Sequence, residues 1–150
     1  MKKGKYRNAV FVVVYAKENY KTYYLILKRK LHWNGWEFPK GGTKPFFIET
    51  KMDAVRRELR EETGLKILKI KKFDIWGKYK YRKKLPDRKG IVGQKFYLYA
   101  AEVEKGKVKI DKLEHSGYKW ADFKGAIKKL TWDNQKKCLE AVDEFLKRKG

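Results

Sequence analysis

An uninterrupted apolar run near the start of the chain constrains the fold more than any other segment. Residues 9–14 read Ala-Val-Phe-Val-Val-Val. The run is too short and too rich in β-branched residues for a helix, so it predicts a buried strand. A polar turn over residues 18–21 separates it from a second run, YYLILKRK at residues 23–30. The two runs together predict a β-hairpin.

Strand and helix signals continue along the rest of the chain. Further strands are expected at residues 36–38, 65–75, 94–103 and 118–120, and helices at residues 50–63, at 122–130, and from Thr131, as a cap, to about Arg148. We also expect a glycine-containing loop at residues 40–45, a basic strand end with an exposed loop at residues 78–89, and a core position for Trp120. The length of 150 residues suits one domain over residues 1–150.

The composition is that of a globular but strongly basic chain. Apolar residues make up 42%, which is ordinary for a folded domain. The 40 lysines and arginines outnumber the 18 acidic residues and give a formal charge of +22. This charge favours polyanionic partners such as RNA, nucleotides or polyphosphates. Solubility and growth at high temperature are competing explanations for an excess of lysine.

Cysteine usage and hydropathy exclude several classes of protein. A single cysteine, Cys138, cannot form an internal disulfide or a multi-cysteine zinc site, and it is compatible with the reducing cytoplasm. No apolar run approaches the ~18 residues that cross a bilayer, so we expect no membrane partner. The sequence is compatible with either a monomer or a homodimer.

The segment from Thr50 to Gly64 gives the clearest helix signal and carries an unusual acidic cluster. Thr50 and Asp53 match a capping box, and Gly64 supplies a C-terminal stop. At about 100° per residue, Met52, Val55 and Leu59 form a buried stripe, beside which three glutamates gather on one arc. They are Glu58, Glu61 and Glu62.

Like charges at these spacings repel one another, so the cluster needs an explanation. A solvated acidic face is one interpretation. The other is a site for a hard cation, Mg²⁺ or Mn²⁺, held by carboxylate oxygens. The upstream segment Trp-Glu-Phe-Pro-Lys-Gly-Gly at residues 36–42 favours the cation, because two glycines permit close backbone approach and Lys40 is placed to meet phosphate. A metal helix beside such a loop is what magnesium-assisted cleavage of a phosphoanhydride requires.

These residues resemble the signature of the Nudix hydrolases, G-x5-E-x7-R-E-U-x-E-E-x-G-U, where U is a bulky aliphatic residue. Glu49, seven further residues and the segment Arg57–Leu65 match its distal part. The proximal part departs, because six residues separate Gly42 from Glu49 and seven separate Gly41 from it. The resemblance covers residues 8–146 and implies a mixed α/β fold, the Nudix α/β/α sandwich with a mixed sheet between helices.

The resemblance also implies residue roles. Glu58, Glu61 and Glu62 would bind the cations together with a carbonyl of Gly41 or Gly42. Glu49 and Arg57 would form a structural ion pair, although Arg57 also has a local partner at Glu61. The general base would be Glu61 or Glu114, and His115 is more readily a hydrogen-bonding loop residue than a proton carrier. Lys40 and Lys95 would hold phosphates.

Two subgroups are similar beyond the signature. Residues 36–41 resemble the W-x-F-P-K-G segment of asymmetric diadenosine tetraphosphate hydrolases and bacterial RNA pyrophosphohydrolases, and residues 114–120 resemble the E-H-x-x-Y-x-W segment of the former. Three tyrosines, Tyr79, Tyr81 and Tyr97, are candidates for stacking on a base, with packing in the sheet as their alternative.

Three functional hypotheses follow. The first is Mg²⁺-dependent hydrolysis of a nucleoside polyphosphate, with diadenosine tetraphosphate split into ATP and AMP. The second is removal of pyrophosphate from the 5′-triphosphate end of RNA, which the basic charge favours. The third is a basic RNA-binding module on a Nudix scaffold without turnover, against which the intact glutamate set argues.

Overall fold

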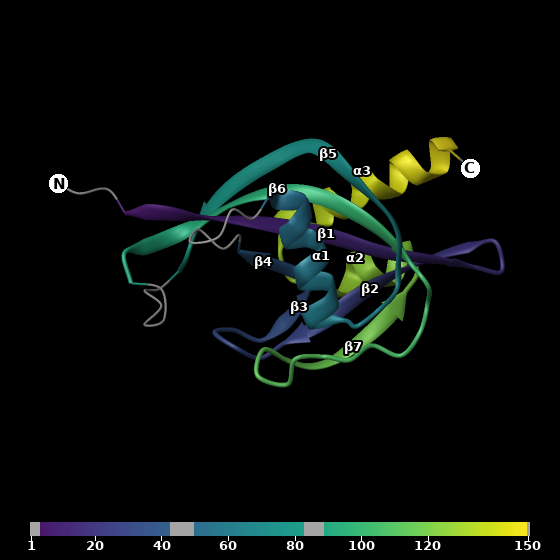
Figure 1. The fold of residues 1–150 in the computed structure, drawn as a ribbon, viewed down its shortest axis with the longest axis horizontal. Coiled ribbons are helices and arrows are strands. Elements are labelled where there is room, and N and C mark those ends of the chain that lie inside the picture. Colours follow the sequence, from purple (N-terminus) through teal and green to yellow (C-terminus); the bar gives the residue numbers. More distant parts are fainter. Residues whose placement is uncertain (1–3, 43–49, 83–88, 150) are drawn as a thin grey trace.

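The computed structural model describes residues 4–42, 50–82 and 89–149. Within them, strands and helices follow one another along the chain as Figure 1 shows. The strands are β1 (Lys5–Glu18), β2 (Lys21–Arg29), β3 (Gly35–Glu37), β4 (Lys40–Gly42), β5 (Ile67–Lys80), β6 (Ile91–Val103) and β7 (His115–Ala121). The helices are α1 (Lys51–Glu62), α2 (Phe123–Lys129) and α3 (Asp133–Lys149).

The strands form one mixed sheet whose main path runs β3-β2-β1-β6-β5. β1 and β6 pair in parallel, whereas β1 with β2 and β5 with β6 pair antiparallel. Off this path, β4 pairs with β1 and β7 pairs with β2. The first apolar run of the sequence therefore becomes the central strand, and β5 ends the path.

β1 is buried on both faces because helices cover both faces of the sheet. Val10, Val12 and Val14 pack in a cluster with residues of α1, whereas Phe11 and Val13 pack in a second cluster with residues of α2 and α3. In Figure 1, α1 lies in front of the sheet and the other two helices lie behind it. Successive side chains of a strand point to opposite faces, so only an unbroken apolar run satisfies both clusters. The predicted mixed sheet between helices is confirmed.

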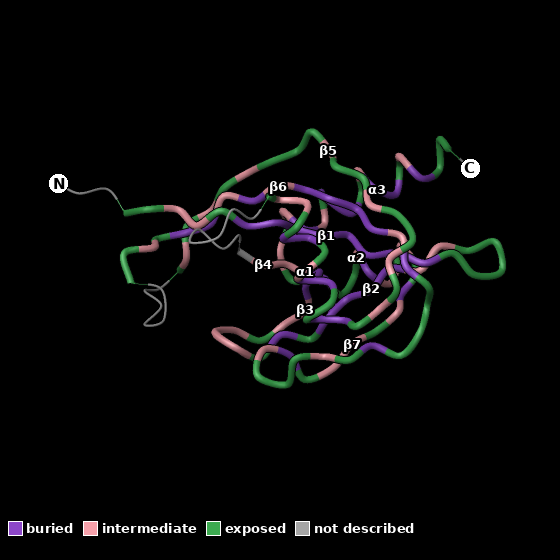
Figure 2. The backbone as a smooth tube through the Cα atoms, in the orientation of Figure 1, coloured by how far each residue is buried: buried purple, intermediate pink, exposed green. Residues whose placement is uncertain are grey.

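Burial follows this arrangement along the chain. Figure 2 shows β1 and β2 largely buried and β5 largely exposed. The predicted hairpin of β1 and β2 turns at Asn19 and Tyr20, whose φ angles of 53° and 64° give the turn a twist that suits antiparallel strands. The tight turn fixes the register of the two strands.

The caps of α1 are those the sequence predicts. The Thr50 side chain accepts a hydrogen bond from the Asp53 backbone N–H, and the Asp53 side chain accepts one from the Thr50 N–H. Gly64 follows the helix at a φ of 68°, a conformation that favours glycine. These caps fix the two ends of the acidic helix.

Three local expectations need correction. Lys40–Gly42 is a strand paired with β1, not a loop. Thr131 does not cap α3, which begins at Asp133, because the Thr131 hydroxyl accepts a hydrogen bond from the Trp36 backbone N–H instead. Trp120 packs against the core cluster that includes α1 but is only half-buried, because its indole N–H donates to the carbonyl of Gly106 near the surface. None of the described helices is long and apolar enough to cross a membrane.

Candidate active site

α1 turns two of its three clustered glutamates inward. Glu58 and Glu62 are one helical turn apart and are only 8% and 3% exposed, whereas Glu61 is exposed. The inward pair flanks the buried stripe of Val55 and Leu59, since residues four apart share one face of a helix. The helix therefore carries a buried carboxylate pair and a solvent-facing third carboxylate.

Arg57 binds the two glutamates that lie nearest to it. Its Nη1 atom lies 2.8 Å from Glu58 Oε1 and 3.3 Å from Glu61 Oε2. The local Arg57–Glu61 pair considered in the sequence analysis is therefore present. The other predicted partner, Glu49, lies outside the described residues. Because Glu61 is exposed whereas Glu58 and Glu62 are buried, the three glutamates do not share one environment.

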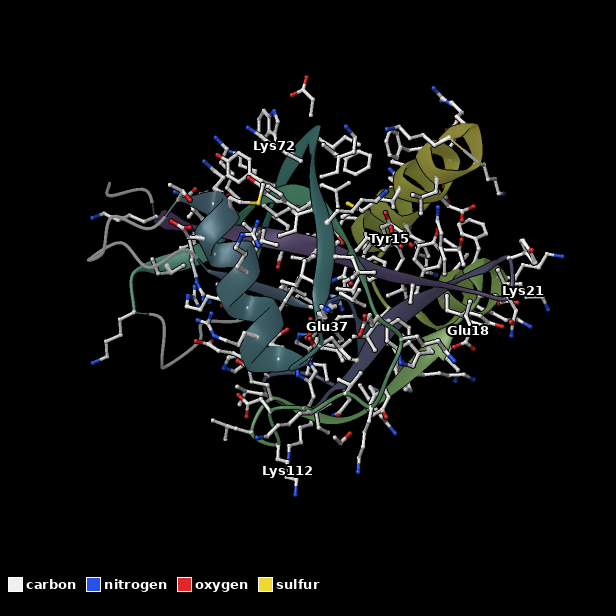
Figure 3. All side chains as sticks on the ribbon, turned by 45° about the vertical axis from the view of Figure 1, so that its right-hand side comes forward. Tyr15, Glu18, Lys21, Glu37, Lys72 and Lys112 are labelled. Atoms are coloured by element: carbon white, nitrogen blue, oxygen red, sulfur yellow. The ribbon has the colours of Figure 1, made fainter. Side chains whose placement is uncertain are left out.

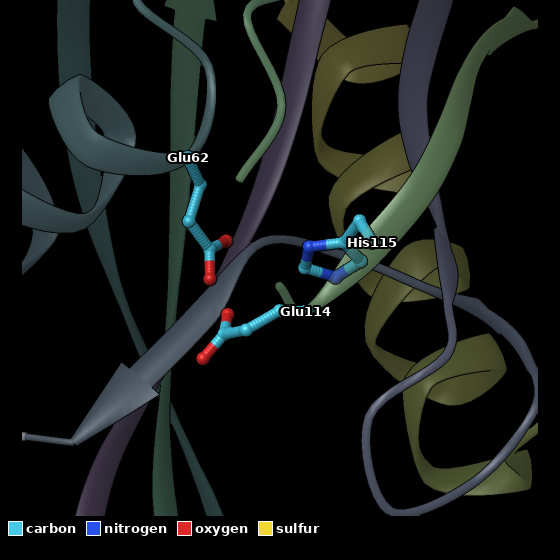
Figure 4. A group of neighbouring side chains, drawn as sticks. All are labelled: Glu62, Glu114 and His115. Carbon is cyan, nitrogen blue, oxygen red and sulfur yellow. The ribbon is translucent and has the colours of Figure 1, made fainter. Parts of the chain in front are cut away.

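Glu62 instead meets two residues at the start of β7. One ligand-type atom from each of Glu62, Glu114 and His115 lies within 4.8 Å of the other two. Figure 4 shows the two carboxylates and the imidazole ring facing a common space. Within the described residues, Glu62 Oε2 and His115 Nδ1 are buried without a hydrogen-bond partner. His115 is thus a buried residue that opens a strand rather than the expected loop residue.

β4 brings the glycine segment against the acidic helix. A Cβ atom added at Gly41 would overlap the carboxylate of Glu58, so no residue with a side chain fits there without a shift. Gly42 pairs with Ala9 of β1. The close approach that the two glycines predict is present at Gly41, and it places the backbone of β4 beside Glu58.

Burial and mutual repulsion disfavour ionisation of both inward glutamates. Burial, with weaker effects from Glu61 and Glu114, raises the pKa of Glu58 to about 7 although Arg57 opposes the rise. Burial, with the nearby charges of Glu58, Glu37 and Glu114, raises the pKa of Glu62 well above its usual range. The two groups form a buried site that a cation would stabilise.

A second buried carboxylate close by has the opposite surroundings. Glu37, near the middle of the molecule in Figure 3, is fully buried. Its Oε2 atom lies 3.1 Å from Arg29 Nη1 and 2.8 Å from His115 Nε2, and its Oε1 atom lies 3.4 Å from Lys40 Nζ. Burial opposes its ionisation, but Lys40, His115 and Arg29 together lower the pKa of Glu37 to about 2. Glu37 is therefore an anion neutralised by cations, although its Oε1 atom has only the ion pair with Lys40 and no hydrogen bond among the described residues.

The residues around Glu62 fit a divalent cation. They offer carboxylate oxygens, which hard cations such as Mg²⁺ and Mn²⁺ prefer, together with one imidazole nitrogen. Glu62 Oε2 is a buried oxygen that lacks a partner among the described residues, and the lack of a side chain at Gly41 leaves room for the Glu58 carboxylate against the backbone of β4. The fit rests on this donor set, which does not identify the ion.

Lys40 connects the carboxylates to a basic, aromatic cavity of about 960 Å³. Tyr79 and Tyr81, at the C-terminal end of β5, line it, and Tyr79 also packs against the core cluster, so base stacking by these tyrosines stays a prediction. Lys40 lines the cavity too, and burial opposes its charge, but Glu37 raises the pKa of Lys40 and keeps it a cation. A cation and several aromatic rings around one cavity suit a phosphate attached to a base.

Two of the predicted substrate residues lie elsewhere. Lys95 and Tyr97 are not among the residues that line the cavity, whereas their neighbour Gln94 is. Along β6, Gln94 alternates with Lys95, so its side chain lies on the same side of the sheet as Phe96, in the cluster that includes Tyr79. Lys95 and Tyr97 belong to the opposite side, with α1. The alternation of side chains therefore places Gln94 at the cavity, and the roles of Lys95 and Tyr97 in substrate binding stay predictions.

Sequence reasoning missed several residues around the two sites. Trp33 and Trp132 line the cavity with ring centroids 5.1 Å apart, and the Arg82 guanidinium lies 4.9 Å from the Trp132 ring. No periodic pattern marks them, because they lie outside the strands and helices. Glu37 was also missed, although an acidic residue between Trp36 and Phe38, near two basic residues, is a detectable signal.

The family model described as "NUDIX domain" matches residues 5–142. An RNA pyrophosphohydrolase of Legionella pneumophila strain Corby is 30% identical over 129 residues, covering 75% of this chain and 69% of its own length. Another from Alkalilimnicola ehrlichii is 28% identical over 128 residues, covering 78% and 70%.

Solved structures share the fold. A Nudix hydrolase described as putative, from Listeria monocytogenes, superposes with a TM-score of 0.76 at 24% identity and covers 94% of each chain. A binary complex of the Ap4A hydrolase of C. elegans gives 0.73 at 24% identity, covering 93% of this chain and 97% of its own. The family match over nearly the whole chain, the sandwich fold and the buried glutamates of α1 agree, and the chain belongs to the Nudix hydrolase family.

Proposed function

We propose that the protein is a Mg²⁺-dependent hydrolase that splits diadenosine tetraphosphate (Ap4A) into ATP and AMP. The observation that carries the proposal is the closeness of two unlike regions. Glu62 and Glu114 form a carboxylate group, and Arg29, which lines the basic aromatic cavity together with Lys40, lies 3.8 Å from Glu114 Oε2. The first suits a divalent cation, and the second suits a nucleotide. Together they supply what cleavage of a phosphoanhydride next to a nucleoside requires.

The roles of the residues follow from where their atoms lie. Glu58 and Glu62 hold the cation, with the backbone of the Gly41 segment beside them. When bound, a divalent cation neutralises phosphate oxygens and makes an attacking water more acidic. Lys40, fixed by Glu37 at 3.4 Å, holds a phosphate oxygen at the mouth of the cavity. The adenine base stacks among the rings of Tyr79, Tyr81, Trp33 and Trp132.

Glu114 is the better placed of the two candidate general bases. It lies in the group with Glu62 and is half-buried, and Arg29 Nη1 lies 3.8 Å from its Oε2. Glu61 is exposed and paired with Arg57. Water attacks one phosphorus, the base accepts the proton, and the phosphate-bearing nucleotide leaves. Kinetics of Glu114→Gln and Glu61→Gln identify the base, because the variant that lacks the base loses far more of kcat than of its affinity for substrate.

A second candidate substrate is the 5′-triphosphate end of RNA, with pyrophosphate released. Two observations favour it: the formal charge of +22, and the relatives from Legionella and Alkalilimnicola, which are RNA pyrophosphohydrolases by name. The alignments cover only about two thirds of those relatives, so their names do not fix the substrate of this chain.

The test is a substrate panel with Mg²⁺. Diadenosine tetraphosphate and 5′-triphosphate RNA are each incubated with the protein, and products are separated by chromatography. ATP plus AMP supports the first proposal, and pyrophosphate from RNA supports the second. Competition between the two at rising salt ranks them, because RNA binding through phosphates weakens steeply with ionic strength. No metal-dependent product from any polyphosphate would leave the non-catalytic RNA-binding module as the function.

A further inference from the structure

The side of β5 and β6 that faces away from the cavity carries a second group of aromatic and basic residues. Trp76 pairs directly with Tyr97 across the two strands, and Lys78 pairs directly with Lys95. Because alternate residues of a strand share a face, all four side chains lie on the α1 side of the sheet. We call this surface, together with Lys51 at the start of α1, the β5–β6 platform.

The cations of the platform lie over its rings. Lys51 Nζ is 4.4 Å from the centre of the Tyr97 ring, and Lys95 Nζ is 4.8 Å from the Trp76 ring and 5.5 Å from the Tyr97 ring. The Trp76 side chain is nevertheless 59% exposed, which is unusual for the largest apolar side chain. More than half of the surface of Trp76 is therefore accessible to a ligand.

The charge of the platform is unbalanced. Within the described part of the chain, Lys51, Lys78 and Lys95 form no ion pair with a carboxylate. Two lysines directly opposite each other in a sheet repel. Packing of the aliphatic parts of the lysine side chains on the aromatic rings explains part of the arrangement. It does not explain why Trp76 is exposed or why Lys78 lies opposite Lys95. A chain of phosphates between the lysines would offset their repulsion.

We propose that the β5–β6 platform binds a single-stranded nucleic acid chain, with phosphates at its lysines and a base stacked on Trp76. Exposed rings interleaved with cations are the arrangement that proteins use to bind single strands without sequence preference. An anionic membrane is disfavoured, because the apolar surface consists of flat rings within a sheet rather than an inserting helix. The proposal does not depend on phosphoanhydride cleavage, because it concerns the body of a strand and not its 5′ end.

The position of β5 supports a continuous path for such a strand. β5 ends the path of the sheet, and in Figure 1 it arches along the outer side of β6. Residues of β5 and its C-terminal end alternate between the two sites: Tyr79 and the following Tyr81 line the cavity, whereas Trp76 and Lys78 belong to the platform. A nucleic acid whose end occupies the cavity would reach the platform by crossing this edge.

The test measures binding of a 5′-hydroxyl oligonucleotide of 20 nucleotides, labelled at its 3′ end, by fluorescence anisotropy in EDTA at low salt. RNA and DNA of one sequence form two arms, and a duplex and vesicles of anionic phospholipid form two more. The protein should bind the single strands more tightly than the duplex or the vesicles. Trp76→Ala should weaken the binding at least about fivefold, the lower end of the range for one stacked base.

Lys78→Glu should weaken binding about tenfold at low salt and flatten its salt dependence. Its matched control is Lys112→Glu, which makes the same change of charge at a residue far from β5 in Figure 3. Tyr20→Ala, at the exposed tip of the β1–β2 hairpin, is the control for Trp76→Ala. Circular dichroism and melting confirm that each variant is folded.

Three outcomes overturn the proposal. The first is equal weakening by Lys112→Glu and Lys78→Glu, which would mean that net charge alone binds the strand. The second is preferential binding of vesicles that depends on Trp76, which would identify a membrane surface. The third is no measurable binding of either single strand at low salt. Each outcome is independent of whether the protein hydrolyses any polyphosphate, so failure here and failure of the proposed activity are distinguishable.

Discussion

Glu37 and Glu62 are both almost fully buried, both lie near His115, and they have opposite electrostatic surroundings. Glu37 is contacted by Arg29, Lys40 and His115, and its pKa falls to about 2. Glu62 has carboxylates as its charged neighbours, and its pKa rises. The difference shows that burial alone does not decide the role of an acid. A buried carboxylate that cationic side chains already neutralise stabilises the fold. A buried carboxylate without a cationic side chain beside it is suited to bind a metal cation.

The largest expected effect is on catalysis by Glu62→Gln. This variant should lose about a thousandfold or more of kcat, because it removes a ligand from the cation site. Its melting temperature should stay the same or rise slightly, because repulsion from Glu58 and Glu114 is relieved. Activity assays with Mg²⁺ and thermal melting measure the two effects. Heavy loss of stability would mean that Glu62, like Glu37, is structural. Glu144→Gln, at an exposed glutamate of α3, is the matched control.

Glu37→Gln should show the reverse pattern in stability. Removing the charge leaves Arg29, Lys40 and His115 without their common partner, and breaking a buried ion pair from one side costs about 3–5 kcal/mol. Urea unfolding measures the change in free energy. Glu104→Gln, at an exposed residue paired with Lys66, should change it little. A stable Glu37→Gln protein would remove the distinction between the two acids.

Mg²⁺ should stabilise the protein through Glu62 and not through Glu37. At a concentration about 100 times its Kd, a ligand that binds only the folded state adds about 2.7 kcal/mol. For a domain of this size that is a rise of about 5–10 °C in Tm. Differential scanning fluorimetry with Mg²⁺ and with EDTA measures it. The rise should disappear in Glu62→Gln, and its persistence there would place the cation elsewhere.

Lys40 contacts Glu37 and also lines the cavity, so Lys40→Ala should act mainly on substrate binding. Loss of one charge-assisted contact to phosphate should raise KM about tenfold and leave kcat within a few fold. Steady-state kinetics with diadenosine tetraphosphate separate the two constants. An unchanged KM would contradict the phosphate contact. Lys129→Ala, whose ammonium lies 5.2 Å from the Trp36 ring, is the control lysine.

The smallest expected effect is on the pH dependence of stability in the absence of metal, where Glu37 and the two inward glutamates of α1 should act in opposite directions. The pKa of Glu58 is about 7 in the folded protein, against an ordinary value of 4.5. The contribution of Glu58 to the stability of the fold is therefore fully present below pH 4.5 and is lost as the pH rises through 7. Glu62 acts in the same direction. Glu37 acts oppositely, since its stabilisation is present above pH 4.5 and is lost toward pH 2. The melting temperature in EDTA should fall by a few degrees between pH 5 and pH 8. The fall should be smaller in Glu62→Gln. A melting temperature that rises over this range would contradict the assignment.

The local features of the fold could be predicted because their causes are local. The run at residues 9–14 is apolar at every position, so it needed a strand covered on both faces, and β1 has that place. Thr50, Asp53 and Gly64 set the ends of α1 through contacts within a few residues. Thr131 shows the limit of such reasoning, because its hydroxyl accepts from Trp36, a distant residue that no local pattern reveals.

The sequence by itself determined the family, the central strand, the acidic helix and the glycine segment, since spacing along one element decides which side chains share a face. Only the tertiary structure decided which acid is neutralised and which is not. Glu62 meets Glu114 and His115 where the end of α1 lies beside the start of β7, and Glu37 meets His115 because β3 and β7 both pair with β2. Such contacts join residues far apart in the chain, and their charges interact strongly because the fold excludes water from between them.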